Sequence, residues 1–401
     1  MKIAFFSNFL NHHQSTVADE LYKQTGGEYV FVETMPMPKS LLKGGYPDCS
    51  SKPYLLQAWK GKKEQAEARN LALNADIALF AGFEVLEYEK LRLSKTSKLS
   101  FDVSERWLKR GLINLLSPRI LKMFLSYHLG RWGKKNIYKL CSSSFGANDY
   151  KRLRMYKNKC FKWGYFTKVT DLENEIFTKE ILDKQTKDNV SLMWCSRFLK
   201  LKHPELAIFM AKRLKDKGYK FILDMYGSGT LLERSKELTS SLKLDDVIHF
   251  CGNAPNEKIL QIMRQHEIFL FTSDSHEGWG AVVNESMSNG CVIVGSDAIG
   301  AIPFLVKNGV NGQIFKSSSR SLGFLKNKIK YDKKALDSLC EKVEWLLNNP
   351  EARKKMSYEA YKTIAEIWSP AKAASNLLQL INDLQNGRES SIKEGPCSYA
   401  I

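Results

Sequence analysis

The 401-residue sequence has no apolar stretch long enough to cross a membrane. A spanning helix needs about 18 or more consecutive apolar residues, and the best candidate, residues 112–129, is interrupted by Pro118, Arg119 and Lys122. The apolar run at residues 3–6 is also too short for a signal peptide, because polar residues follow it at once. We therefore expect no membrane-spanning helix, and we interpret the first apolar run as a buried strand.

The sequence also lacks paired cysteines. Its eight cysteines are scattered, with neither a Cys-x-x-Cys motif nor a cluster with histidines. This spacing argues against a zinc site and against a disulfide framework. Reduced thiols are typical of a cytoplasmic protein, and we expect that location.

Acidic residues are outnumbered by basic ones. The chain has 43 Asp and Glu and 61 Lys and Arg, which gives a formal net charge of +18. Apolar residues make up 43% of the chain and charged residues 26%. This composition is that of a globular protein and excludes a wholly disordered, collagen-like or coiled-coil chain. The positive excess indicates anionic partners, such as nucleic acid, anionic lipid or phosphorylated substrates.

The positive charge is concentrated in one region. Residues 90–168 contain 20 Lys and Arg but only three acidic residues. Within this region, residues 106–135 interleave basic side chains with Trp and Leu, a pattern typical of helices that lie on an anionic membrane surface. The alternative is an ordinary amphipathic helix whose Lys and Arg face water. Nucleic-acid binding is not expected, because no recognised motif accompanies the charge.

Short apolar runs alternate with helical patterns along the whole chain. This alternation predicts βαβ units and parallel sheets. Because it occurs in two successive series, it predicts an α/β fold of two doubly wound, Rossmann-like domains whose ligands bind at the carboxyl ends of the strands. The strands are expected at residues 2–7, 29–33, 77–80, 99–103, 140–144, 159–162, 190–195, 221–226, 247–250, 268–272 and 291–295.

The stretch most informative about function follows the expected strand at residues 268–272. Glu277 lies in a glycine-containing turn, and Glu285 follows eight residues later in the next expected helix. Gly278 and Gly280 allow the backbone to approach a ligand closely, and a helix N-terminus attracts anions. We expect the two carboxylates to line one pocket and to accept hydrogen bonds from sugar hydroxyls. The alternative is that Glu285 only stabilises the helix dipole and that Glu277 is an exposed loop acid.

Two cations follow the first strand of the second series. Arg197 and Lys202 can grip a diphosphate, Arg through its planar fork and Lys as a point charge. The alternative is a solvated basic loop. Glycines at the ends of the next two strands, Gly227 and Gly252, add weight to a ligand site at this edge of the sheet.

These motifs together resemble those of the retaining GT-B glycosyltransferases of family 4. The resemblance rests on Glu277-x₇-Glu285, on the Ser-x-x-x-Glu-Gly-x-Gly run that begins at Ser273, and on the Arg197 and Lys202 pair. It covers most of the second domain and the two-domain plan. Residues 156–166 also resemble the interdomain crossing of bacterial polysaccharide-assembly members of this family.

The resemblance implies a donor site. It makes Glu277, Arg197 and Lys202 the catalytic set: Glu277 would contact the hydroxyls of the donor sugar, and the two cations would hold the diphosphate. Glu285 would accept hydrogen bonds from the ribose. Further contacts with the donor are implied at Gly278, Trp279, Gly280, Ala281, Val282, Gly227, Phe250, Gly252 and Asn253.

The sequence departs from the family pattern at one place. Phe304 stands where Glu is common, and one glycine is missing from the loop before it, a departure that can alter this loop and the donor preference with it. No Asp-x-Asp motif occurs, although metal-dependent enzymes that use nucleotide sugars usually carry one. We therefore expect neither a metal nor a cofactor, with basic residues and a helix dipole in place of the cation.

The first domain should bind the acceptor. Asn11, His12 and His13 follow the first strand, and Glu105 and Arg106 follow the strand expected at residues 99–103. The histidines could bind acceptor hydroxyls or phosphate, or assist a proton transfer. The alternative is a polar helix cap with one buried histidine.

The resemblance gives the domains their expected roles. Residues 1–168 form an acceptor domain with the basic segment 106–135, residues 169–365 form the nucleotide-sugar domain, a helix at 366–386 crosses back to the first domain, and 387–401 are disordered. We expect a peripheral, cytoplasmic-face enzyme that moves a sugar from a nucleotide-diphosphate sugar, UDP by family frequency, to a lipid-linked or membrane-proximal saccharide. The alternatives are a catalytically idle basic protein that binds membrane or nucleic acid, and a nucleotide-sugar epimerase.

Overall fold

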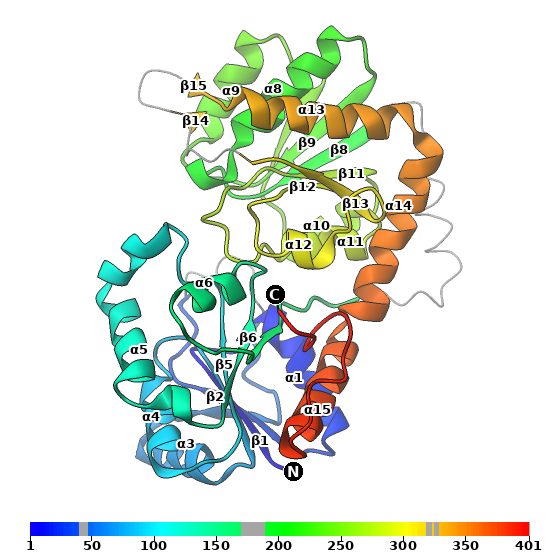
Figure 1. Ribbon diagram of the computed structural model, residues 1–401. Helices are drawn as coiled ribbons and strands as arrows, with labels where there is room; N and C mark the ends of the chain where they lie inside the picture. The colour runs from blue at the N-terminus through cyan, green and yellow to red at the C-terminus, as the bar shows by residue number, and fades with distance from the viewer. Residues whose placement is uncertain (40–46, 170–188, 318–322, 325–328, 401) are drawn as a thin grey trace. The chain divides into compact units, whose positions relative to one another are not determined.

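The computed structural model describes residues 1–39, 47–169, 189–317, 323–324 and 329–400. The chain divides into two compact units, which we call unit 1 (Met1–Lys168 with Ile367–Ile401) and unit 2 (Val169–Glu366). Each unit is built on a parallel sheet with helices on both faces, and Figure 1 labels their elements. This architecture confirms the expected α/β class with two Rossmann-like sheets. Among the described residues, no helix is long and apolar enough to cross a bilayer.

The sheet of unit 1 has seven strands in the order β3-β2-β1-β4-β5-β6-β7, and all neighbouring pairs are parallel. The inner strand β1 is wholly buried, in agreement with its largely apolar sequence. The strands are β1 (Ile3–Ser7), β2 (Tyr29–Glu33), β3 (Leu55–Gln57), β4 (Ile77–Ala81), β5 (Ser100–Ser104), β6 (Ile137–Cys141) and β7 (Cys160–Lys162).

Helices cover both faces of this sheet. On one face, Ala4 and Phe6 of β1 pack with Leu71 of α3 in a buried apolar cluster. On the other face, α1 and α15 lie side by side, and the side chain of Gln24 donates to the carbonyl of Ala371 at 3.1 Å. The helices of unit 1 are α1 (His12–Gln24), α3 (Lys62–Asn74), α4 (Leu86–Lys95), α5 (Pro118–His128), α6 (Gly146–Arg152) and α15 (Pro370–Gln385). The C-terminal helix therefore belongs to unit 1.

A buried ion pair joins two neighbouring strands of unit 1. Lys139 of β6 stands opposite Asp102 of β5, with 2.8 Å between Nζ and the carboxylate, and the lysine side chain is fully buried. Tyr156 donates its hydroxyl hydrogen to the same carboxylate at 2.8 Å. The Lys139 ammonium also lies 4.7 Å from the ring centroid of Tyr150. Charged and aromatic groups thus surround this lysine in place of water.

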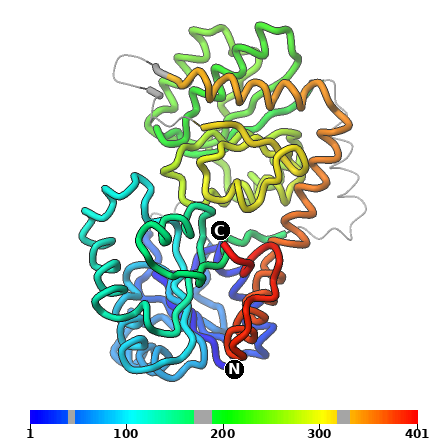
Figure 2. The backbone as a smooth tube through the Cα atoms, viewed as in Figure 1, coloured from blue at the N-terminus to red at the C-terminus, as the bar shows by residue number. Residues whose placement is uncertain are grey.

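The expectation of a disordered tail is wrong for residues 387–400. The amide of Cys397 donates to the carbonyl of Lys162 at 2.7 Å, and the amide of Lys162 donates to Ser398 at 2.8 Å. Tyr399 forms an antiparallel bridge with Phe161. The segment leaves α15 and doubles back within unit 1 (Figure 2), where it covers the otherwise open edge of β7. Polar composition suggested disorder, but an unpaired sheet edge offers backbone partners that composition does not show.

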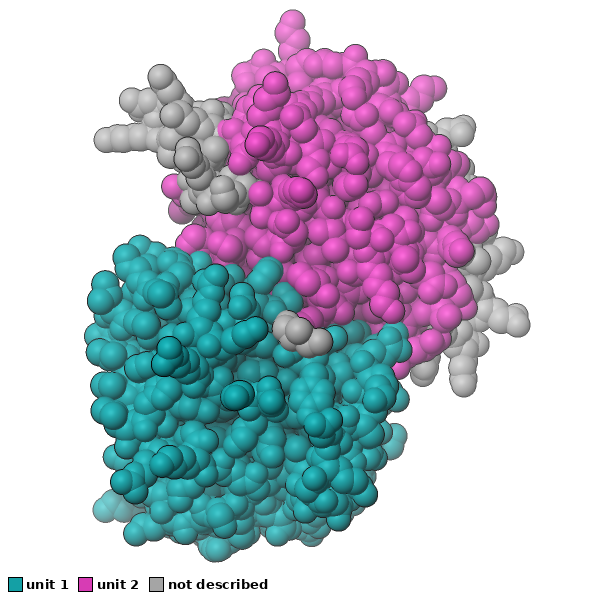
Figure 3. Space-filling view, viewed as in Figure 1, with its two compact units in different colours: residues 1–168, 367–401 teal, residues 169–366 magenta. Residues whose placement is uncertain are grey.

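Unit 2, coloured magenta in Figure 3, has a six-stranded sheet in the order β10-β9-β8-β11-β12-β13. All of its neighbouring pairs are parallel. The strands are β8 (Val190–Cys195), β9 (Phe221–Tyr226), β10 (Ile248–Gly252), β11 (Ile268–Phe271), β12 (Val292–Ser296) and β13 (Gly312–Phe315). A separate antiparallel pair consists of β14 (Gly323–Phe324) and β15 (Ile329–Lys330).

The main core of unit 2 lies between its sheet and the helices α8 and α13. Leu206 and Met210 of α8 and Leu339 of α13 pack against alternate strand residues such as Leu192 and Leu223. The helices of unit 2 are α8 (Pro204–Asp216), α9 (Leu232–Ser241), α10 (Asn256–Met263), α11 (Val282–Ser288), α12 (Ile302–Leu305), α13 (Lys333–Asn348) and α14 (Pro350–Lys362). The candidate donor residues follow the carboxyl ends of the strands that form this core.

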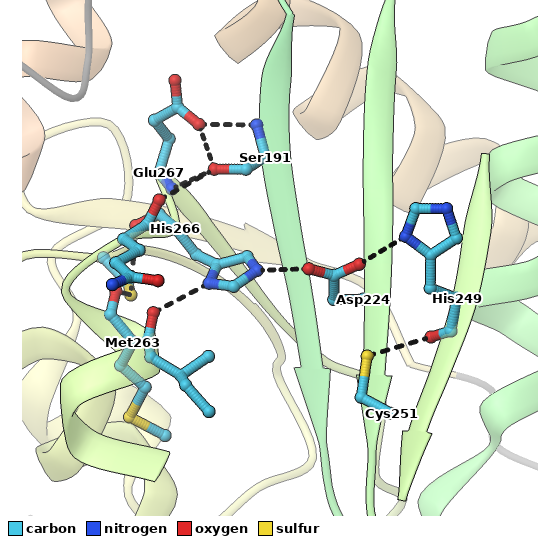
Figure 4. A network of polar contacts seen from close by, with 10 residues as sticks. Ser191, Asp224, His249, Cys251, Met263, His266 and Glu267 are labelled. Atoms are coloured by element: carbon cyan, nitrogen blue, oxygen red, sulfur yellow. Dashed lines mark hydrogen bonds and ion pairs between the residues drawn. The ribbon is translucent and has the colours of Figure 1, made fainter. Parts of the chain in front are cut away.

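A polar network links β9 and β10 of this sheet to the residues before β11 (Figure 4). Asp224 of β9 lies 2.9 Å from Nδ1 of His249 and 3.0 Å from Nε2 of His266. Nδ1 of His266 lies 2.8 Å from the carbonyl oxygen of Ile262. Although burial opposes it, hydrogen bonds from His266 and His249 lower the pKa of Asp224. The network ties β9 and β10 to the residues that precede β11.

Candidate functional site

The carboxyl ends of β8 and β11 carry an ion pair between two predicted site residues. The two strands are parallel neighbours, so their following loops open at the same edge of the sheet. Lys202 ends the short turn after β8, and Glu277 lies in the loop after β11. The Lys202 ammonium is ion-paired with the Glu277 carboxylate, and these side chains are only 11% and 16% exposed. The structure therefore brings this predicted cation and carboxylate together.

Backbone and side-chain hydrogen bonds hold the two loops against each other. The amide of Asp274 donates to the carbonyl of Leu201 at 3.0 Å. The Thr272 hydroxyl donates to the carbonyl of Lys202 at 2.6 Å and accepts from the indole of the buried Trp194 at 2.9 Å. The Lys202 backbone is thus fixed from the β11 side.

Glu285 lies in the helix that follows this loop, buried in α11. Its carboxylate accepts from the side-chain amide of Asn256 at 3.1 Å. Burial raises the pKa of Glu285, and the Asn256 hydrogen bond opposes that shift. Burial and the charge of Glu285 together raise the pKa of the Cys195 thiol to about 12, while Lys202 opposes them. Glu285 and Lys202 are thus both close enough to Cys195, at the end of β8, to change the pKa of its thiol.

The glycine loops after β9 and β10 also lie at this edge. Gly227 has φ 131° and donates its amide to the carbonyl of Gly252 at 2.8 Å. A Cβ at Gly227 would lie 1.9 Å from the carbonyl oxygen of Ser196, so only glycine fits there. The side-chain amide of Asn253 donates to the Ser228 hydroxyl at 2.9 Å. The predicted residues Gly227, Gly252 and Asn253 therefore converge with the start of the Arg197 loop.

Trp279 is a core residue rather than an exposed one. Its side chain is fully buried, and its indole donates to Asn284 at 2.9 Å. Phe304, the departure from the family pattern, packs with its ring centroid 6.2 Å from that of Trp279. Gly280 has φ 90°, and a Cβ there would lie 2.5 Å from the Phe271 ring. Phe304 therefore extends the apolar packing behind the turn.

The other predicted donor residues occupy varied environments. Arg197 is exposed at the end of β8. Phe250 is half-buried and packs against the core cluster of unit 2. Gly278 is buried, whereas Ala281 and Val282, at the start of α11, are half-buried.

In unit 1, a cavity of about 560 Å³ opens at the carboxyl ends of β1, β4 and β5. It is lined by four of the five predicted acceptor residues, namely Asn11, His13, Glu105 and Arg106. Apolar side chains such as Phe9, Trp107 and Met123 line it as well. The cavity thus offers both polar and apolar contacts.

Two of the charged residues that line this cavity, Glu105 and Arg106, are engaged in pairs. Glu105 accepts from the Tyr165 hydroxyl and from the Lys109 ammonium, both at 2.9 Å. Arg106 donates to the buried Asp149 from Nη2 at 3.1 Å and from Nε at 3.3 Å. These contacts hold both side chains in one orientation at the cavity wall.

Asn11 and His13, which follow β1, both line the cavity, and Asn11 also caps α1. The Asn11 side chain caps α1 by accepting from the amides of His13 and Gln14 at 3.0 and 3.1 Å. The His13 ring is stacked 5.7 Å from that of Tyr165, and among the described residues its Nδ1 has no hydrogen-bond partner. Burial, with a contribution from His12, lowers the pKa of His13, so this imidazole is neutral. His12 is outside the set that lines the cavity.

Sequence reasoning missed His203, Asp274 and Tyr165. His203 directly follows Lys202 and contacts Asp274 across the two loops. Asp274 lies three residues before Glu277, and that proximity is the signal that could have found it. Tyr165 could not be found in this way, because its partner Glu105 is 60 residues away in the chain.

Solved structures with similar folds match almost the full length of this chain. Anabaena Alr3699/HepE in complex with UDP has a TM-score of 0.66 at 14% identity, covering 95% of this chain and all of that one. A glycosyltransferase from Rickettsia africae has a TM-score of 0.63 at 15% identity, covering 96% and 98%. At these identities the likeness shows the fold alone, and that fold is GT-B.

Curated relatives match part of the chain. The GtfA subunit of the UDP-N-acetylglucosamine–peptide N-acetylglucosaminyltransferase of Streptococcus pneumoniae is 27% identical over 161 residues, 38% of this chain and 31% of that protein. An uncharacterized glycosyltransferase of Methanocaldococcus jannaschii is 32% identical over 142 residues, 35% of this chain and 36% of that protein. The chain thus spans about a third of the length of these relatives. Residues 174–363 match the family described as "Glycosyl transferases group 1", and unit 2 therefore carries a glycosyltransferase group 1 domain.

Proposed function

We propose that this protein is a retaining glycosyltransferase that moves a sugar from a UDP-sugar to a lipid-linked or membrane-proximal saccharide. The observation that carries the proposal is the Lys202–Glu277 ion pair within a glycosyltransferase group 1 domain. It sets a cation suited to a diphosphate beside a carboxylate suited to sugar hydroxyls. We place the reaction at the cytoplasmic face of the membrane, in the assembly of a cell-surface polysaccharide.

The chemistry follows from these charges. An acceptor hydroxyl oxygen forms the new bond to the anomeric carbon, while the bond from that carbon to the donor phosphate breaks. The departing diphosphate takes the proton of the hydroxyl. Lys202 and Arg197 stabilise the negative charge that grows on the leaving group, which is electrostatic catalysis. Glu277 holds the hydroxyls of the donor sugar.

The remaining donor contacts come from neighbouring loops. Glu285 accepts from the ribose hydroxyls, and the loop around Gly252 flanks the base. UDP is favoured because the pneumococcal relative is named for UDP-N-acetylglucosamine and because the Anabaena protein was solved with UDP and with UDP-glucose. Since the cation pair serves the diphosphate, we propose that transfer needs no metal. Full activity after treatment with a chelator would support this, and loss of activity that magnesium or manganese restores would refute it.

The acceptor side of the proposal rests on unit 1. Its cavity offers hydrogen-bonding groups for a saccharide. Beyond it, the segment at residues 111–129 exposes large apolar side chains, with Leu116 at 79% and Leu129 at 76% exposure. Lys122 of the same segment, with Lys90, lines a shallow groove beside them. Apolar side chains among cations suit an anionic membrane, where a lipid-linked acceptor resides.

Thermal unfolding with UDP, GDP, ADP and CMP tests the donor site, with duplex RNA as the control. A ligand at about 100 times its Kd stabilises a protein by roughly 2.7 kcal/mol, which a melting scan detects. We expect a shift with one nucleoside diphosphate and its loss in Glu285→Ala. A shift with RNA but with none of the nucleotides would favour the alternative of a catalytically idle basic protein. Conversion of one UDP-sugar into its epimer, with no transfer, would favour an epimerase.

A further inference from the structure

His203 is buried directly behind the Lys202–Glu277 pair. It has a left-handed backbone conformation, with φ 46° and ψ 56°, between the turn that ends at Lys202 and the first residue of α8. This conformation is uncommon for residues other than glycine, and here the side chain is held on both sides. Its Nδ1 lies 2.6 Å from a carboxylate oxygen of Glu205, and its Nε2 lies 3.2 Å from one of Asp274.

The protonation of this ring follows from its partners. Both ring nitrogens face carboxylates that only accept hydrogen bonds, so both must donate, and the ring is an imidazolium. Burial alone would lower the pKa of His203, but hydrogen bonds and charges from Asp274 and Glu205 outweigh it and raise this pKa to about 9. The ring therefore carries its charge throughout the neutral range.

Other charged groups around His203 come from three elements. Glu205 belongs to α8, and Asp274 and the half-exposed His276 belong to the loop after β11, where His276 donates to Asp274 from its amide at 2.9 Å. Tyr331 and Asp332, just before α13, line a small cavity of about 10 Å³ together with His203. The carboxylates on these elements make the surroundings of the ring negative, so loss of its proton would leave buried negative charge uncompensated.

The imidazole joins the two loops that carry the donor residues. His203 is the residue after Lys202, whose neighbour Leu201 accepts from the Asp274 amide. On the other loop, Asp274 accepts at its carbonyl from the amide of Glu277 at 3.1 Å. A displacement of His203 from Asp274 would therefore move Lys202 relative to Glu277.

We propose that His203, by bridging Glu205 and Asp274, is a positioning residue that sets the distance between Lys202 and Glu277 for donor binding. The proposal rests on the proposed function, because it assigns a supporting residue to that same site. It makes sugar transfer depend on the proton of a residue that touches neither donor nor acceptor. Above the pH at which the ring loses its proton, one of the two carboxylates has no donor, and the loops lose their register.

The test compares wild type with Glu205→Gln and His203→Gln across pH 6 to 10, in donor KM and kcat. Glu205→Gln keeps the shape of the residue but removes one of the two negative charges. Since one close opposite charge shifts a pKa by about 1–3 units, the alkaline fall in kcat/KM should begin at least about one pH unit lower in this variant. Its donor KM should rise roughly tenfold at pH 8.5 and stay near the wild-type value at pH 6.

His249→Gln provides the matched control. It removes another imidazole that contacts a carboxylate in unit 2, Asp224, but lies on β10 away from the Lys202 loop. Its pH profile should match that of wild type. Equal KM, kcat and pH profile in wild type, Glu205→Gln and His203→Gln would overturn the proposal for His203 alone. Absence of both UDP binding and transfer in wild type would overturn the proposed function, and this inference with it.

Discussion

Raising the pH should lower the free energy of unfolding of unit 2, because His203 loses its proton. The size of this effect follows from the pKa of His203. The pKa of His203 is raised from 6.5 to about 9 in the folded state. At 1.36 kcal/mol per pKa unit, a shift of roughly 2.5 units corresponds to about 3 kcal/mol of stability. Because the folded-state pKa is the higher one, this contribution is complete below pH 6.5 and is lost as pH rises toward 9.

Hydrogen exchange in urea measures this effect for unit 2 alone. The free energy of unfolding is obtained from peptides within residues 190–226, for wild type and His203→Gln at each pH from 6 to 10. Comparison at the same pH cancels the intrinsic exchange rate and the titration of other groups. The advantage of wild type over the variant should shrink by about 3 kcal/mol between pH 6 and pH 10. A difference that stays constant over this range would show that His203 is not held as an imidazolium.

Three other perturbations test the site, the core of unit 1 and the exposed segment. Lys202→Met should lower transfer by about 10²-fold or more. Glu277→Gln should bind UDP at least as tightly as wild type, because Lys202 no longer has a competing carboxylate, but it should transfer sugar poorly. UDP titration and turnover measurements check both variants. Asp102→Asn should cost about 3–5 kcal/mol in urea unfolding, since it removes the ion-pair partner of the fully buried Lys139, and adding Lys139→Met should recover most of that loss. Leu116→Asp with Leu129→Asp should weaken binding to phosphatidylglycerol vesicles without changing UDP binding. Failure of wild type to bind these vesicles would contradict membrane contact, and equal binding to neutral and anionic vesicles would contradict a role for the positive charge.

Most of the fold was predictable because the buried strands are largely apolar and alternate with helical patterns. The expected strands at residues 29–33, 190–195 and 221–226 coincide with β2, β8 and β9. The prediction for β6 was displaced, since residues 140–144 were expected and the strand is Ile137–Cys141. The cause is Lys139, whose charge suggests a surface position although Asp102 compensates it inside the sheet.

Among the strands that escaped prediction, β3 and β13 are too short for an apolar pattern to show. β3 (Leu55–Gln57) has three residues, all half-buried. β13 (Gly312–Phe315) has four residues and begins with Gly, which is a poor strand former. Both are outermost strands of their sheets, where pairing with one neighbour decides the conformation more than local sequence does.

The candidate donor site was predictable in part because its residues lie at strand ends. Lys202 and Glu277 were placed at the ends of two strands, and parallel strands bring such ends together. The order of strands in the sheet, which makes β8 and β11 neighbours, could not be derived from spacing. For the same reason His203 and Asp274, whose contact depends on that adjacency, went unnoticed.

The loops above the sheet of unit 2 hold paired charges at two depths. The inner group, His203 with Glu205 and Asp274, is buried, and loss of one partner would leave an uncompensated charge in the interior. Breaking this group is therefore costly, and it favours one arrangement of the two loops. The outer pair, Lys202 with Glu277, is partly exposed and can exchange partners. In the proposed function, a diphosphate that pairs with Lys202 brings its own negative charge and leaves Glu277 available for sugar hydroxyls. The proposed binding of an anionic sugar donor therefore depends on a fixed inner group beneath an outer pair that the donor diphosphate would open.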